Sequence, residues 1–217
     1  MSQAARISAA AVNAAFPKYP ITVHDKGWTY GVWYCGTAWT PVKLHGQYPP
    51  TFLKRALALF PDAKDIIHVP SGALKDVPGV TVDAVRDDVR CPQILADAGD
   101  LPFANASQDL ILSDPPYSVA DSKVYGCAPF PLGKFMKESH RILRPGGHLG
   151  MLHVYYPSYR RKMWKLQALI AVVTGFQRAT RMFSVFERLP DSAATHVSRS
   201  IPVESAELFP LAQAETK

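Results

Sequence analysis

The sequence predicts an α/β fold with a mostly parallel sheet, and two observations carry this prediction. Five short apolar segments have the composition of buried strands, and the connections between them are long enough for crossovers, one of which has helical periodicity. The strand segments are DIIHV (65–69), GVTVDAV (79–85), PQILADA (92–98), QDLILSD (108–114) and HLGMLHV (148–154), and the helical crossover is LGKFMKESHRIL (132–143). Successive strands joined by such crossovers run in the same direction.

Before the first of these strands, the sequence predicts a hairpin and a helix. GWTYGVWYCGTAW (27–39) alternates aromatic and small residues between glycines, as two short strands would, and residues 1–15 form a loose tail or a short helix. In the segment 47–63, Thr51 precedes a stretch of periodic apolar residues and Pro61 closes it. This segment is therefore expected to contain an amphipathic helix.

The C-terminal third is expected to add one more helix and two strands. The helix is placed from Tyr159 to Val173, and the strands at 176–181 and 183–187. After Pro190 the sequence becomes a polar tail. The expected organisation is an N-terminal extension with an aromatic hairpin at 1–46, a main domain at 47–190 and a C-terminal tail at 191–217.

The composition is that of a globular protein that needs neither metal nor disulfide. Of 217 residues, 47% are hydrophobic and 19% are charged, and the formal net charge is +6, which suits a polyanionic partner such as nucleic acid without identifying one. The three cysteines are widely separated, so reduced thiols are expected. The sequence has no run of eighteen apolar residues and no signal-like start, so a cytoplasmic location and no membrane association are expected. The spacing of His140, His148 and His153 fits no compact metal site. The oligomeric state stays open.

The segment Ser113 to Ser118 carries the chemistry. It follows the apolar strand QDLIL directly, and open α/β sheets bind their ligands outside the carboxyl ends of their strands. The Asp114 carboxylate can accept one hydrogen bond and the carbonyl of Pro115 another. The two consecutive prolines, Pro115 and Pro116, keep the chain rigid. Tyr117 adds a flat face on which a nucleobase can stack. By itself, such a tetrapeptide also fits a simple turn at the end of a strand.

Asp114-Pro115-Pro116-Tyr117 resembles the fourth motif of the class I S-adenosylmethionine-dependent amino-methyltransferases, which methylate exocyclic amines of nucleobases. This resemblance implies a Rossmann-like fold with a mostly parallel seven-stranded sheet and helices on both faces. It also implies S-adenosylmethionine as the cofactor and all four motif residues as catalytic. Aspartate at position 114, rather than serine, favours adenine N6 over cytosine, and argues against protein amide methylation by enzymes with Asn-Pro-Pro-Tyr.

The resemblance extends over about residues 47–188 and implies a set of cofactor-binding residues. The loop after the first strand would approach the methionine moiety, an acid after the second strand would bind the ribose, and ILADAGDLPF (94–103) would flank the adenine. The residues implied are His68, Ser71, Gly72, Asp83, Asp97, Ala98 and Asp114. The chain departs from the family in the first loop, where it has one glycine, Gly72, instead of two or three. Upstream, Tyr48 and Thr51 lie where relatives contact the methionine carboxylate.

The substrate predicted on this basis is nucleic acid, with DNA favoured over RNA. Sequence-specific DNA methyltransferases carry a sizeable insert for target recognition, whereas only the segment 118–131 separates Tyr117 from the next helix. Short or absent sequence specificity is therefore expected. Three surfaces are available to contact the substrate: the segment SVADSKVYGCAPFPLG (118–133), the aromatic residues at 27–39 and the basic segment YRRKMWK (159–165). RNA adenine methylation, and a catalytically weak protein that binds only the cofactor or nucleic acid, are the alternatives.

Overall fold

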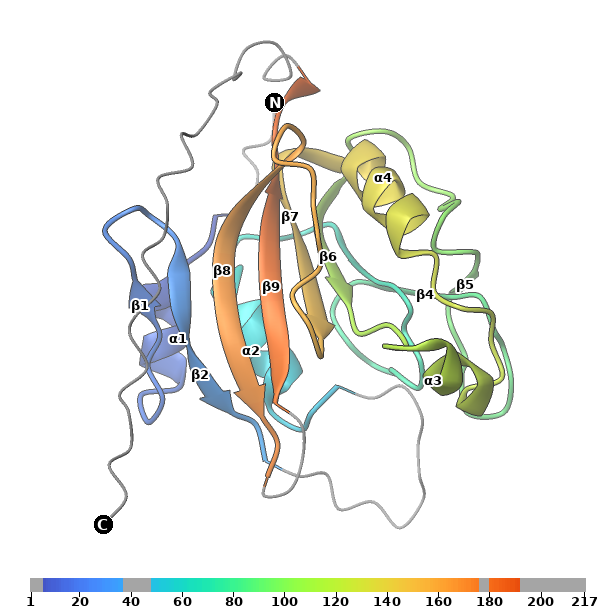
Figure 1. Cartoon of the computed structure of the whole chain (residues 1–217), viewed down its shortest axis with the longest axis horizontal. Helices are drawn as coiled ribbons and strands as arrows, with labels where there is room; N and C mark the ends of the chain where they lie inside the picture. The colour runs from blue at the N-terminus through green and yellow to red at the C-terminus, as the bar shows by residue number, and fades with distance from the viewer. Residues whose placement is uncertain (1–5, 37–47, 176–179, 192–217) are drawn as a thin grey trace, which may run out of the picture.

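A computed structural model describes residues 6–36, 48–175 and 180–191, and in these residues the strands form one sheet (Figure 1). The sheet has nine strands in the order β1-β2-β8-β9-β7-β6-β3-β4-β5. The strands are β1 (Thr22–Val23), β2 (Thr29–Tyr34), β3 (Ile66–His68), β4 (Val80–Asp83), β5 (Ile94–Leu95), β6 (Gln108–Ser113), β7 (Leu143–His153), β8 (Trp164–Val173) and β9 (Arg181–Arg188). All five strand segments expected from the apolar pattern are present.

The sheet is mostly parallel, as predicted. Strands β5, β4, β3, β6 and β7 are parallel neighbours, and β2 is parallel to β8, whereas β9 is antiparallel to both β7 and β8. The prediction of a Rossmann-like α/β fold is confirmed. The sheet has nine strands rather than seven because the hairpin β1–β2 adds two strands to the seven formed by residues 66–188.

Helices cover both faces of the sheet, which was also predicted. The helices are α1 (Ala9–Ala15), α2 (Phe52–Leu59), α3 (Val119–Val124) and α4 (Leu132–Ile142). Figure 1 shows α2 behind the sheet and α4 in front of it. Two buried clusters match these layers, since one contains residues of α1 and α2 and the other contains residues of α4.

Strand β6 lies between the two clusters, and this position accounts for its apolar sequence. Leu110 and Leu112 belong to the cluster with α2, while Ile111 belongs to the cluster with α4, because successive side chains of a strand point to opposite faces. All six residues of β6 are buried. A strand buried on both faces reads as a continuous apolar run. This central strand leads directly into Asp114.

The expected hairpin is present, but it lies earlier in the chain than predicted. Strand β2 pairs with β1, which precedes it, so the antiparallel hairpin spans Thr22–Tyr34 instead of 27–39. Trp33 is buried against Phe52 and Phe183, whereas Tyr30, Val32 and Tyr34 are exposed. Residues 37–39 lie outside the described residues. Pairing of β2 with β8 makes the hairpin part of the sheet.

The prediction of a helix from Tyr159 to Val173 is wrong, since Trp164–Val173 forms strand β8. An apolar run of this length does not distinguish a buried strand from a helix by periodicity. The burial pattern alternates along the second half, with Ala168, Ile170 and Val172 fully buried, and β-branched side chains favour a strand. The strand expected at 183–187 is confirmed as part of β9, and residues 176–179 of the other candidate lie outside the described residues.

The remaining expectations at the two ends are met only in part. The N-terminal segment contains the short helix α1, whose Ser8 hydroxyl accepts a hydrogen bond from the Ala11 amide at 3.1 Å. The predicted tail beyond Asp191 lies outside the described residues. In the part of the chain that the structure describes, no helix has the length and hydropathy needed to span a membrane.

Candidate functional site

A cavity of about 300 Å³ opens at the carboxyl ends of β3, β4, β5 and β6. Its walls come from the loops that follow these four strands and from the segment between α3 and α4. The lining residues are Tyr48, Val69, Pro70, Ser71, Gly72, Leu74, Asp83, Ala84, Val85, Arg90, Ala96, Asp97, Ala98, Asp114, Pro116 and the segment 125–131. Ligand sites of open α/β sheets lie at this edge.

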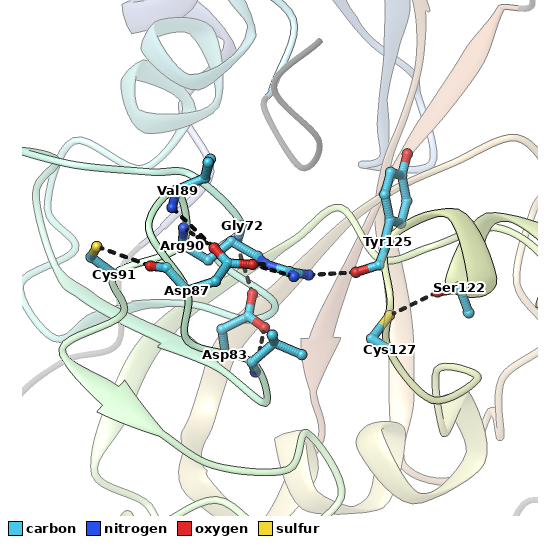
Figure 2. Close-up of polar contacts among 10 residues, drawn as sticks. Gly72, Asp83, Asp87, Val89, Arg90, Cys91, Ser122, Tyr125 and Cys127 are labelled. Carbon is cyan, nitrogen blue, oxygen red and sulfur yellow. Dashed lines mark hydrogen bonds and ion pairs between the residues drawn. The ribbon is translucent and has the colours of Figure 1, made fainter. Parts of the chain in front are cut away.

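The loop after β3 is tied to the end of β4 by Asp83. One carboxylate oxygen accepts the Gly72 amide at 2.9 Å and the other accepts the Val85 amide at 3.0 Å (Figure 2). Gly72 has a φ of +55°, a conformation that glycine adopts without strain. Asp83 therefore shapes the loop, and each of its oxygens keeps a second lone pair that can accept a ligand hydroxyl.

Beyond β5, Asp97 and Ala98 line the cavity, and the sequence resemblance predicts contacts of these two residues with the adenine of the cofactor. The Asp97 side chain is exposed and accepts the Gly99 amide at 2.7 Å, which fixes the turn that follows. Ala98 is buried in the cluster with α4. The structure thus brings together six of the seven predicted cofactor residues at one cavity: Ser71, Gly72, Asp83, Asp97, Ala98 and Asp114.

His68 is the seventh predicted cofactor residue, and it does not line the cavity. Its side chain is fully buried, and Nε2 lies 2.9 Å from the carbonyl oxygen of Pro78. Burial lowers the pKa of this imidazole. His68 therefore supports the loop between β3 and β4 from the protein interior and does not face the cavity.

The motif places Asp114 in a three-residue cluster with Tyr117 and Arg181. The Tyr117 hydroxyl donates a hydrogen bond to Asp114 Oδ1. Arg181, at the start of β9, lies 3.4 Å from Asp114 Oδ2 and 3.3 Å from the Tyr117 hydroxyl, both measured from Nη1. Both oxygens of the carboxylate are thus in contact with donors from the protein.

The rest of the motif lies around this cluster. Pro116 lines the cavity, whereas Pro115 is buried and neither Pro115 nor Tyr117 is among the lining residues. The Tyr117 ring lies 4.8 Å from the ring of His153 and 5.9 Å from the guanidinium carbon of Arg181. Burial lowers the pKa of His153 to about 4, so this imidazole is neutral at pH 7. Tyr117 therefore lies beside the cavity, where its ring contacts the His153 ring and the Arg181 guanidinium.

The Asp114 carboxyl group is largely buried. Its side chain is 13% exposed, and burial raises its pKa to about 6, although Arg181 and the Tyr117 hydrogen bond oppose this rise. Burial also raises the pKa of Tyr117, and the charge of Asp114 adds to this effect. Asp114 is therefore mostly ionised at neutral pH and protonates within the mildly acidic range.

The raised pKa makes Asp114 costly to the fold at neutral pH. Because the folded-state pKa lies above the ordinary value of 3.8, the stabilising contribution of the protonated form is present below pH 4 and is lost as the pH rises through 6. We expect Asp114→Asn to become more stable relative to wild type by about 1 to 3 kcal/mol between pH 4 and pH 8. Urea unfolding at both pH values measures this difference, and a pH-independent difference would show that Asp114 titrates normally.

Two hydroxyls at the cavity have no hydrogen-bond partner among the described residues. Ser71 Oγ and the Tyr48 hydroxyl are both buried and unpaired. Burial raises the pKa of Tyr48 well above its usual range, and the charge of Asp114 adds to the rise. Buried hydroxyls without partners are uncommon, and a ligand in the cavity would supply the missing contacts. Thr51, in contrast, is directed to the backbone, since its hydroxyl lies 3.4 Å from the carbonyl oxygen of Cys35.

Sequence reasoning missed Arg181 and Arg90. It expected the segment 118–133 to contact the substrate, and residues 125–131 of that segment form a wall of the cavity. Arg181 follows Asp114 by 67 positions and reaches it because β9 pairs with β7 in the antiparallel direction. No motif or spacing marks it. The basic segment 159–165, which was predicted to contact the substrate, lies far from the cavity, because Trp164 pairs with Arg188 at the opposite end of the sheet. In the described part of the chain, no group of three or more metal-binding side chains occurs.

Comparisons with known proteins find likeness at the level of structure alone. No family model matches the chain, and no curated protein matches it. TrmN from Thermus thermophilus has a TM-score of 0.46 at 19% identity, over 68% of this chain and 51% of TrmN. The putative methyltransferase yhhF from Escherichia coli has a TM-score of 0.43 at 11% identity, over 72% of this chain and 97% of that one. The chain thus spans about half the length of TrmN.

The antibiotic-resistance methyltransferase Kmr has a TM-score of 0.35 at 16% identity, over 67% of this chain and 84% of Kmr. At these levels of similarity, the substrate of each neighbour belongs to that neighbour alone. The order and directions of the strands in this chain carry the fold assignment.

Proposed function

We propose that this protein transfers a methyl group from S-adenosylmethionine to the exocyclic N6 amine of adenine in nucleic acid. The observation that carries the proposal is the position of the Asp114 carboxylate. It lies at the end of the central strand β6 and lines a cavity that also contains Ser71, Gly72, Asp83 and Asp97. A cofactor site and an acceptor for the amine would therefore meet at one carboxylate.

The residues around the cavity suit S-adenosylmethionine. The acids Asp83 and Asp97 are available to ribose hydroxyls and to the adenine amine, and the apolar Val85 and Ala98 can contact the adenine ring. The unpaired hydroxyls of Ser71 and Tyr48 offer further hydrogen bonds. When bound, the cofactor supplies an activated methyl group on a sulfonium.

Asp114 and Pro115 would orient the amine of the substrate. The lone pair of an exocyclic amine is delocalised into the ring, so its two hydrogens need acceptors that hold the nitrogen in line with the methyl group. The Asp114 carboxylate accepts one hydrogen and the carbonyl of Pro115 accepts the other. The nitrogen gains the methyl carbon as the sulfur–carbon bond breaks, and it loses one proton. Asp114, with a pKa near 6, can take this proton and release it to solvent.

Tyr117 and Arg181 would prepare this acceptor. In the structure the Tyr117 hydroxyl donates to Oδ1 of Asp114, which keeps a second lone pair for the incoming amine, and the Tyr117 ring offers a face on which the base can stack. Arg181 opposes protonation of the carboxyl, because its charge lowers the pKa of Asp114. Each residue thus has a separate function beside the same carboxylate.

The substrate proposed first is DNA with short or no sequence specificity, and RNA is proposed second. Helix α3 occupies part of the segment 118–131, and residues 125–131 line the cavity, so this segment leaves little surface for reading a long site. In a duplex, the target base must leave the stack to reach Tyr117, at a cost of a few kcal/mol. Single-stranded substrates avoid this cost and are expected to react faster.

The test combines calorimetry with methyl transfer. Wild-type protein should bind S-adenosylmethionine and methylate adenine in DNA, and mass analysis of digested nucleosides names the base. A protein that binds the cofactor and methylates neither DNA nor RNA would be a cofactor-binding protein instead. Failure to bind at millimolar cofactor would exclude the enzymatic proposal.

Asp83 and Asp97 should respond differently to substitution with alanine. Asp97→Ala removes an exposed carboxylate, so cofactor affinity should fall by about tenfold while the melting temperature stays within about 2 °C of wild type. Asp83→Ala leaves the buried Gly72 amide without its acceptor, so both affinity and stability should fall, the latter by about 1 to 3 kcal/mol. Calorimetric titration and urea unfolding measure both variants. Equal loss of stability in the two would show that Asp97 is also structural.

A further inference from the structure

One wall of the cavity is a short segment between α3 and α4, residues 125–131, here called the strap. All seven residues of the strap line the cavity. The chain enters it from the end of α3 and leaves it into α4. The strap therefore stands between the proposed cofactor and solvent on this side.

At each end, the strap is held by its neighbours in the sequence. The Cys127 amide donates to the carbonyl oxygen of Ser122 at 3.0 Å, and the Cys127 thiol lies 3.6 Å from the same oxygen. At the other end, the ring of Phe130 packs edge-on against Phe135 of α4, with centroids 5.0 Å apart. These contacts fix the ends of the strap without joining it to the loop between β4 and β5.

Arg90 makes that connection across the cavity. Its Nη1 donates to the carbonyl oxygen of Tyr125 at 2.7 Å, while Nε donates to Asp87 Oδ2 at 2.8 Å (Figure 2). Asp87 is itself held by the amides of Val89 and Arg90, at 3.0 and 2.7 Å. The Arg90 guanidinium thus bridges the Asp87 carboxylate, on the loop between β4 and β5, and the backbone of the strap.

The connection is polar and stays charged at neutral pH. The Arg90 side chain is 17% exposed and lines the cavity. Its hydrogen bond to Asp87 lowers the pKa of that carboxyl to about 2. A planar guanidinium can serve both acceptors at once, whereas a lysine ammonium on a single flexible stem is a poor substitute for this fork.

We propose that Arg90 is a positioning residue that fastens the strap over the cofactor cavity and slows the exit of S-adenosylmethionine. The identity of the ligand rests on the proposed function, but the closure of the strap does not. Cofactor that occupies the cavity would contact the strap along one wall, so movement of the strap would ease its departure. Loss of the Arg90 contacts should therefore increase both opening of the strap and dissociation of the cofactor.

Cys127 provides a reporter for opening. Cys35 is buried and Cys91 is exposed, so a Cys91→Ser background leaves Cys127 as the thiol that responds to the strap. In this background and without cofactor, Arg90→Ala should raise the rate of Cys127 modification by a maleimide by about tenfold or more. Arg90→Lys and Asp87→Asn should give smaller rises.

Arg86→Ala is the matched control. Arg86 lies in the same loop, is exposed, and donates to the carbonyl oxygen of Pro92 at 2.7 Å instead of to the strap. Its modification rate should match the parent. If Arg90→Ala proves unstable at the assay temperature, Arg90→Lys and Asp87→Asn decide the question. Modification rates in the Arg90 and Asp87 variants that equal the Arg86→Ala rate would overturn the proposal.

Stopped-flow dissociation of S-adenosylmethionine gives the second measurement. Arg90→Ala should raise the dissociation rate by about tenfold, and bound cofactor should protect Cys127 in the parent protein. Faster thiol modification with an unchanged dissociation rate would contradict a role in cofactor retention. If the parent binds no cofactor at all, the proposed function fails, whereas the contrast in thiol modification between Arg90→Ala and Arg86→Ala still tests the strap.

Discussion

Replacing Asp114 with alanine should lower the single-turnover rate of methyl transfer to adenine by about a thousandfold or more, with cofactor affinity changed by less than about threefold. The carboxylate is the proposed acceptor for the amine, so its loss acts on the reacting group. The cofactor keeps its proposed contacts with Ser71, Asp83 and Asp97 at the other walls. Rates on single-stranded and duplex oligonucleotides, together with calorimetric affinities, measure this separation.

Substitutions at Tyr117 provide the control. Tyr117→Phe removes the hydroxyl that donates to Asp114 and keeps the ring, so it should retain much of the activity. Tyr117→Ala removes the stacking face, and both substrate affinity and turnover should fall. Adenine methylation by Asp114→Ala at the wild-type rate, or a cytosine or amino acid as the methylated product, would show that the catalytic assignment is wrong.

Arg181 should set the pH at which the proposed methyl transfer occurs. In wild type, the transfer rate should rise with pH through about 6, because Asp114 must be ionised to accept the amine hydrogen. The groups with a charge or titratable proton facing Asp114 are Tyr48, Tyr117, Tyr125 and Arg181. Of these, Arg181 is the cation that favours the ionised carboxylate.

Removal of that cation raises the pKa of Asp114, so the rising limb of the pH–rate profile should move to higher pH in Arg181→Met. At pH 6.5 this variant should be about tenfold slower than wild type or more, with partial recovery near pH 9. Arg181→Lys keeps the charge and should preserve the midpoint. A uniform loss at every pH would mean that Arg181 contributes only to packing.

The central part of the fold could be predicted from local sequence alone. QDLIL reads as a strand because Leu110, Ile111 and Leu112 are buried on both faces, and the helical spacing in 132–143 identifies α4. Segments of this kind carry their structure in their own composition and period. The cofactor-loop residues could be placed together for a related reason, since parallel strands bring their carboxyl ends to one edge.

Strand β8 shows where local reasoning failed. The residues from Leu166 to Val173 fit an apolar helix or a buried strand, and pairing with β2 and β9 decides between them. That pairing satisfies backbone hydrogen bonds across segments far apart in the sequence, which no local window contains. The same pairing places the basic segment 159–165 at the end of the sheet opposite the cavity.

By itself, the sequence determined the parallel core of the sheet and the Asp114 motif at the end of its central strand, because apolar runs and a rigid Asp-Pro-Pro segment are local properties. Only the tertiary structure decided what surrounds that motif. Arg181 reaches Asp114 through the antiparallel register of β9 on β7, and Arg90 reaches the strap across the cavity. Both contacts join residues tens of positions apart, and their geometry depends on how the strands pack rather than on any spacing along the chain.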